Sequence, residues 1–130
     1  MLVALDHVNV RSSRVEELAA FYVEVLGLVR GPRPPFSFAG AWLYCGDQPA
    51  VHLVDAGTRP PVAQEPDELR LSHFALRGTH LADFLARLGR AGVQFRLGQL
   101  PAAGVTQVNL RDPDGNALHV DFVATPSTWP

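Results

Sequence analysis

The sequence predicts an α+β fold made of two tandem βαβββ modules, and three observations predict it. A short motif at residues 5–10, LDHVNV, reappears at 71–76 as LSHFAL. In each half a helix-period apolar stripe and then three strand-like runs follow this motif. Turn-forming residues separate the last two runs of each half, at 46–49 and at 112–116. A repeated order of elements is the mark of an internal duplication.

In the first module, about residues 1–56, the motif predicts a strand that leads into a helix. Ser13 is expected to cap this helix, with Glu16 closing a capping box three positions later. Gly27 is expected to end it. Three further strands are predicted, and they cover 28–30, 41–45 and 50–55.

The second module, about residues 70–124, repeats the pattern. Thr79 is expected to cap its helix and Gly92 to end it. The strands that follow are predicted at 93–97, 106–111 and 117–123. Between the modules, about residues 57–69 are rich in proline and polar side chains, which indicates a linker rather than an element.

Composition narrows the possible partners. The 130 residues are 47% apolar and 18% charged, which is typical of one globular domain spanning 1–130. A formal net charge of −2 without a basic run argues against nucleic acid. Neither a signal-like start nor an apolar run of about 20 residues is present, so a cytoplasmic protein without a membrane span is expected. The single cysteine, Cys45, ends an apolar run and is expected to be buried and inert.

Four of the five histidines occupy equivalent places in the two modules. His73 follows His7 by 66 positions, and His119 follows His52 by 67. Strand alternation places all four on the face away from the helix of their module. If the two sheets curve around a shared hollow, the four imidazoles could converge on one divalent metal ion, because neutral imidazole is a common ligand of such ions. His80, in the first turn of the second helix, is left out and expected to be exposed.

These residues resemble the vicinal oxygen chelate superfamily, which includes glyoxalases, bleomycin resistance proteins and extradiol dioxygenases. The resemblance covers nearly the whole chain. It rests on the motifs 5–7, 21–22 with 26–28, 71–75 and 112–116, taken in this order and spacing. It implies a curved mixed-sheet cleft built from the paired modules. It also implies a divalent metal (Zn, Ni, Co or Fe) held by the first and last strands of each module, at the positions of His7, His52, His73 and His119.

One position departs from the family pattern. Where the second module of family members most often has a glutamate ligand, which in some also moves a substrate proton, this chain has His119. Asp121 lies on the same strand face one step further on. It is therefore a candidate for a ligand, a partner of an imidazole or the general base, or it is simply a charge near the strand end.

The leading hypothesis is a metal-dependent lyase, isomerase or dioxygenase. Its substrate would be a small oxygen-rich molecule that chelates the metal through neighbouring oxygens, and the enzyme is expected to be a homodimer. The alternative is a metal-free protein that sequesters a drug-like molecule. Its cleft would be lined by Phe36, Phe38, Trp42 and Tyr44, although such aromatic residues are also typical of an ordinary core. A non-catalytic interaction module is a third possibility.

Overall fold

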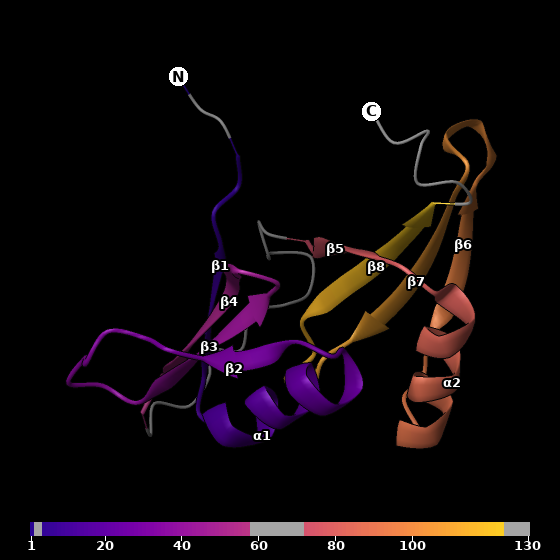
Figure 1. Cartoon of the computed structure of the whole chain (residues 1–130). Coiled ribbons are helices and arrows are strands. Elements are labelled where there is room, and N and C mark those ends of the chain that lie inside the picture. The colour runs from indigo at the N-terminus through magenta and orange to yellow at the C-terminus, as the bar shows by residue number, and fades with distance from the viewer. Residues whose placement is uncertain (2–3, 58–71, 124–130) are drawn as a thin grey trace. The chain divides into compact units, whose positions relative to one another are not determined.

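The computed structural model describes residues 1, 4–57 and 72–123, and the chain divides into two compact units, Met1–Ala63 and Gln64–Pro130. Each unit contains a four-stranded mixed sheet and one main helix (Figure 1). The predicted α+β class and the repeated βαβββ order are therefore confirmed. Of the predicted linker, only residue 57 belongs to the described part of the chain, and of the repeated motif residue 71 lies outside it.

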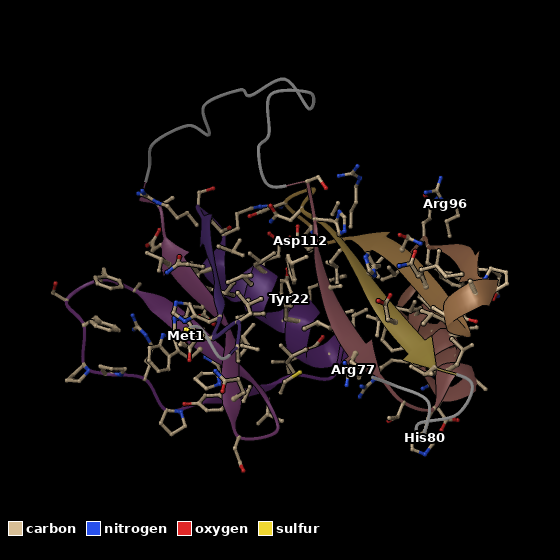
Figure 2. The ribbon with its side chains drawn as sticks, turned by 90° about the horizontal axis from the view of Figure 1, so that it is seen from above. Met1, Tyr22, Arg77, His80, Arg96 and Asp112 are labelled. Carbon is tan, nitrogen blue, oxygen red and sulfur yellow. The ribbon has the colours of Figure 1, made fainter. Side chains whose placement is uncertain are left out.

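The first unit runs through six elements, which are β1 (Val8–Ser12), α1 (Val15–Ala20), the π-helical turn η1 (Phe21–Val25), β2 (Val29–Gly31), β3 (Gly40–Cys45) and β4 (Gln48–Asp55). Its strands are ordered β1-β4-β3-β2, with β1 parallel to β4 and the other neighbours antiparallel. Leu18 and Tyr22 from the helical segment are fully buried together with Leu43 and Leu53 from the sheet. Tyr22 is labelled in Figure 2. Burying each such side chain stabilises the fold by about 1.5–3 kcal/mol.

The second unit repeats this design with β5 (Phe74–Gly78), α2 (Leu81–Ala91), β6 (Arg96–Leu100), the short 3₁₀ turn η3 (Pro101–Ala103), β7 (Val105–Arg111) and β8 (Ala117–Val123). The strand order is β5-β8-β7-β6, and β5 is parallel to β8. Helix α2 covers one face of this sheet, where the Phe84 ring lies 5.4 Å from the Phe122 ring. Leu88 and Val108 are fully buried in the same core.

The helix caps differ from the prediction. The Ser12 hydroxyl, not that of Ser13, accepts the Arg14 N–H, and Glu16 pairs with Arg30 of β2 at 2.7 Å instead of closing a capping box. His80 directly precedes α2 in a left-handed conformation (φ 60°) and the helix has no side-chain cap, so Thr79 does not cap it. The glycine stops are confirmed, since Gly27 and Gly92 both have positive φ.

Two further predictions are corrected. The first strands begin later than the motif suggests, at Val8 and Phe74, which are the residues where parallel pairing with β4 and β8 starts. Cys45 is exposed rather than buried, because it lies at the end of β3, next to a register shift. Partial desolvation still raises the pKa of its thiol, which favours the unreactive protonated form.

Candidate functional site

In the first unit, sheet pairing places His52 on the face away from the core. His52 pairs with Asn9 of β1 and Trp42 of β3, while its strand neighbours Val51 and Leu53 point into the core. His7 is the last residue before β1. Its ring stacks on the His52 ring with centroids 3.8 Å apart, and the Trp42 ring stacks on the same imidazole at 4.1 Å. His52 is therefore enclosed between two rings and is only 8% exposed.

The enclosure of His52 leaves one of its nitrogens without a partner. Its Nε2 atom is buried and has no hydrogen bond within the described residues. Burial lowers the pKa of His52 and the nearby His7 lowers it further, while a hydrogen bond with the Pro49 backbone and the charge of Asp6 raise it by less. Proline offers only its carbonyl, so this bond comes from Nδ1–H, and Nε2 carries the lone pair. A buried polar atom without a partner costs about 1–3 kcal/mol, which points to a ligand at this place.

His7 is also held at Nδ1. That atom lies 2.6 Å from Asp6 Oδ2, and this hydrogen bond, together with one from Gln48, lowers the pKa of Asp6. The Gln48 side-chain amide also donates to the Asp6 backbone carbonyl at 2.7 Å, which ties the segment before β1 to the start of β4. The carboxylate thus fixes the orientation of the His7 ring.

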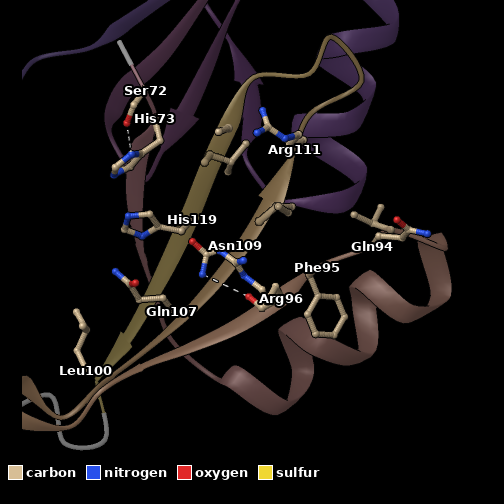
Figure 3. A pocket seen from close by; sticks show the side chains of 14 residues that line it. Ser72, His73, Gln94, Phe95, Arg96, Leu100, Gln107, Asn109, Arg111 and His119 are labelled. Carbon is tan, nitrogen blue, oxygen red and sulfur yellow. Dashed lines mark hydrogen bonds between the residues drawn. The ribbon is translucent and has the colours of Figure 1, made fainter. Parts of the chain in front are cut away.

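In the second unit His119 occupies the equivalent register position, between Ala75 of β5 and Asn109 of β7. His73 is the last residue before β5, and its ring centroid lies 4.9 Å from that of His119, with the planes tilted by 40°. The Nδ1 atom of His119 is 2.6 Å from Asp121 Oδ1. The Nδ1 atom of His73 is 2.6 Å from the hydroxyl of Ser72 (Figure 3).

All four histidines therefore share one chemical arrangement. In each, Nδ1 is engaged by a close neighbour, and among the described residues no protein group bonds Nε2. Metal-binding histidines commonly use their second nitrogen in this way, because a carboxylate or carbonyl at Nδ1 fixes the ring and its tautomer. The Ser72 hydroxyl can donate or accept, so it holds the His73 ring without fixing its tautomer. Asp121 was singled out by sequence, whereas Asp6, Pro49 and Ser72 were not. The sequence signal that could have identified Asp6 and Ser72 is that each is a polar residue directly before a histidine of the set, His7 or His73.

Each unit by itself brings two of the four histidines together. In the described part of the chain, no group of three or more His, Cys, Asp or Glu side chains stands ready to hold a metal ion. His80 belongs to neither pair, because it lies exposed at the start of α2 with its Nδ1 atom 3.1 Å from the Thr79 hydroxyl (Figure 2). The exposure expected for His80 is confirmed.

The aromatic residues of the first unit form a stack that extends from Trp42. Phe36 lies 6.4 Å from Trp42 and stacks on Phe38 at 4.8 Å between centroids. Both phenyl side chains are 43% exposed, and the Arg33 guanidinium covers them at 5.1 and 5.4 Å. Tyr44 donates its hydroxyl to the Pro32 carbonyl. These rings offer an apolar surface beside His52.

The second unit contains a hollow of about 1040 Å³, to which His73 and His119 contribute. Its other polar lining includes Arg96, Gln107, Asn109 and Arg111 (Figure 3). A volume of this order is at the upper end of the range for small-molecule sites. The histidine pair of this unit therefore faces a space large enough for a ligand.

Comparisons with known proteins agree on one family. A family model described as the Glyoxalase/Bleomycin resistance protein/Dioxygenase superfamily matches residues 4–120. The chain is 28% identical to Glyoxylase I 4 of Arabidopsis thaliana, covering 92% of this chain and 70% of that protein.

Solved structures show the same fold. A glyoxylase/bleomycin resistance protein/dioxygenase domain from Frankia sp. EAN1pec superposes with a TM-score of 0.71 at 23% identity, covering 95% of this chain and 99% of that one. Lactoylglutathione lyase from Agrobacterium tumefaciens superposes with a TM-score of 0.65 at 22% identity, covering 92% of each chain.

In the described residues, no helix is long and apolar enough to cross a membrane.

Proposed function

The chain belongs to the Glyoxalase/Bleomycin resistance protein/Dioxygenase superfamily, and on that premise we propose that it is a metal-dependent enzyme. Its substrate would be a small oxygen-rich molecule that chelates the metal through neighbouring oxygens. The names of two similar proteins, glyoxylase I and lactoylglutathione lyase, favour a glyoxalase-type lyase or isomerase over a dioxygenase. The observation that carries the proposal is the set of four histidines with Nδ1 held and Nε2 left for a ligand.

The donor set fits a divalent first-row metal. His7, His52, His73 and His119 would hold it, and imidazole nitrogens suit Zn, Ni, Co or Fe better than Mg. The buried Nε2 of His52 is the strongest single sign, because it has no hydrogen-bond partner among the described residues and burial lowers the pKa of the ring, which favours its neutral form. When bound, the metal would supply a Lewis acid that polarises substrate oxygens.

The remaining chemistry falls to side chains beside the histidines. Asp6 and Asp121 hold the Nδ1 hydrogens of His7 and His119 and so fix which nitrogen each ring presents. For proton transfer, Asp121 is the proposed general base in place of the family glutamate. Its Oδ1 atom bonds His119, so Oδ2 is the atom proposed to accept a substrate proton.

The decisive experiment measures metal content and affinity of protein purified without a histidine tag. We expect a divalent metal bound more tightly than micromolar, and weaker binding in His7→Ala, His52→Ala, His73→Ala and His119→Ala. His80→Asn is the matched control, because Asn tolerates the left-handed backbone at that position. Wild-type affinity weaker than micromolar, or unchanged affinity in the four variants, would refute the metal-dependent enzyme.

A second function is favoured by the aromatic stack. Phe36 and Phe38 are large, stacked and exposed beside Trp42, as in a surface that binds planar apolar molecules. A protein that sequesters a drug-like molecule would use this surface without a metal. Metal analysis separates the two functions, since sequestration predicts ligand binding that a chelator does not change.

A further inference from the structure

The hollow of the second unit has an unbalanced charge. Two arginines, Arg96 and Arg111, line it together with the histidine pair, and none of its lining residues is Asp or Glu. The Asp121 carboxylate lies on the same strand face as His119 but is engaged by His119 Nδ1 at 2.6 Å. Within the described residues no carboxylate forms an ion pair with either guanidinium, and Arg111 donates only to the Gly115 carbonyl at 2.7 Å. A hollow lined by charge of one sign concentrates ligands of the opposite sign.

Strand register places the two arginines within reach of one ligand. Arg96 pairs with Asn109, and Asn109 pairs with His119, so the three residues form one row across β6, β7 and β8 (Figure 3). Arg111 lies two residues beyond Asn109 on the same face of β7. One strand spacing and two residue steps put the Cα atoms of the two arginines about 8 Å apart. Long guanidinium side chains can close on one oxyanion over that distance.

We propose that this hollow binds an oxyanion group, a carboxylate or a phosphate, through Arg96 and Arg111. Guanidinium groups suit this task because their planar N–H fork matches carboxylate and phosphate oxygens. The amides of Gln107 and Asn109 line the same hollow and add neutral donors. The row from Arg96 to His119 then orders the ligand, with its anionic end at β6 and its other end at the imidazoles.

This inference rests on the proposed function only where it calls the ligand a substrate. Under that function, the substrate carries an oxyanion in addition to the oxygens that face the metal. The equivalent row of the first unit contains Asn9, His52, Trp42 and Gly31 and no arginine, so of the two rows only that of the second unit contains a guanidinium.

The test is an NMR titration of the full-length, metal-free protein with succinate, with inorganic phosphate and with neutral succinamide at constant ionic strength. We expect succinate or phosphate, but not succinamide, to shift backbone amide signals of β6, β7 and β8. The anion that binds more tightly assigns the group. Arg96→Gln and Arg111→Gln should each weaken binding about tenfold, as expected for losing a hydrogen bond to a charged group.

Arg87→Gln is the matched control, because Arg87 is an exposed residue of α2 that does not line the hollow. Arg96→Lys should recover part of the affinity, because it keeps the charge and loses the fork. Equal shifts with succinamide, or Arg96→Gln binding like wild type, would overturn the proposal. A Co²⁺ titration of wild type and of Arg96→Gln, which keeps all four histidines, distinguishes the two hypotheses. Anion binding by a wild-type protein that does not bind the metal would refute the proposed enzyme and leave this site. Metal binding by a wild-type protein that does not bind the anion would refute only this site.

Discussion

Replacing Asp121 by asparagine tests whether the contact between Asp121 and His119 supports a metal ligand. The two side chains are 20% and 12% exposed, and 2.6 Å separates Asp121 Oδ1 from His119 Nδ1. A charge-assisted hydrogen bond at a site this shielded contributes about 1.5–3 kcal/mol. Part of it would reach a bound metal, because the carboxylate makes the other ring nitrogen a better donor, and losing such partners typically weakens metal binding about 10–100-fold.

Asparagine and alanine at position 121 should weaken metal binding to different extents. Asparagine keeps a neutral oxygen that can still accept the Nδ1 hydrogen, so we expect a loss near the lower end, about tenfold, or about 1.4 kcal/mol. Alanine removes the acceptor, so we expect a loss near 100-fold. Competition against a chromophoric chelator, with Co²⁺ or Zn²⁺, measures both at fixed pH.

Asp55→Asn provides the control for Asp121. The Asp55 carboxylate lies at the end of β4, where it accepts the Gly57 N–H at 2.8 Å, and it contacts no histidine among the described residues. Its replacement should change metal affinity less than twofold. Wild-type affinity in both Asp121 variants, while His119→Ala binds weakly, would refute the reasoning, because His119 would then ligate without help from the carboxylate.

Four further outcomes are expected. His119→Glu should shift metal preference toward Mn²⁺ or Mg²⁺, because carboxylate is the harder donor; unchanged preference in a competition titration would show that His119 is not a ligand. The metal-free protein should lose stability as pH falls below 6.5, because the folded pKa of His52 is lowered and the unfolded chain takes up the proton first; urea unfolding at pH 7.5 and 5.5 should show a smaller drop in His52→Gln. Gly40→Ala should cost about 1–3 kcal/mol, since the new methyl meets the Leu53 carbonyl, whereas Gly89→Ala, in open space on α2, should gain about 0.5–1 kcal/mol in the same assay. Solution scattering should show a homodimer, and a monomer at high micromolar concentration would contradict this expectation.

The sequence predicted what depends on local patterns. Alternating side chains, helix-period stripes and turn residues gave the βαβββ order, and the glycine stops Gly27 and Gly92 were correct because a left-handed residue favours glycine whatever surrounds it. The sequence missed what depends on partners distant along the chain. Glu16 looked free to close a capping box, but Arg30 on β2 takes its carboxylate. No local sequence pattern shows that Arg30 competes with the helix N-terminus for this carboxylate.

The histidine environments show the same limit. Strand alternation indicated the face of His52, but not that His7 and Trp42 would stack on both sides of its ring and bury Nε2. The residue at which pairing with β4 and β8 begins cannot be read from a local pattern, so the position of His7 and His73 just outside β1 and β5 was not visible either. Asp121 could be singled out, because a spacing of two on a strand guarantees a common face.

Sheet register gives firmer support for equivalent histidines than the repeat offset does. The residues in the row of His52 and their counterparts in the row of His119 are not separated by one constant number of sequence positions. Asn9 and Ala75 are 66 positions apart, Trp42 and Asn109 are 67, and Gly31 and Arg96 are 65. The differences in length fall in the connections between strands, chiefly in those from β2 to β3 and from β6 to β7, because loops tolerate changes of length. Pairing nevertheless returns His52 and His119 to the same place in their sheets. Backbone pairing thus fixes where each imidazole stands, and the residues beside it, an indole in one row and an amide with a guanidinium in the other, give two similar sheets different chemistry.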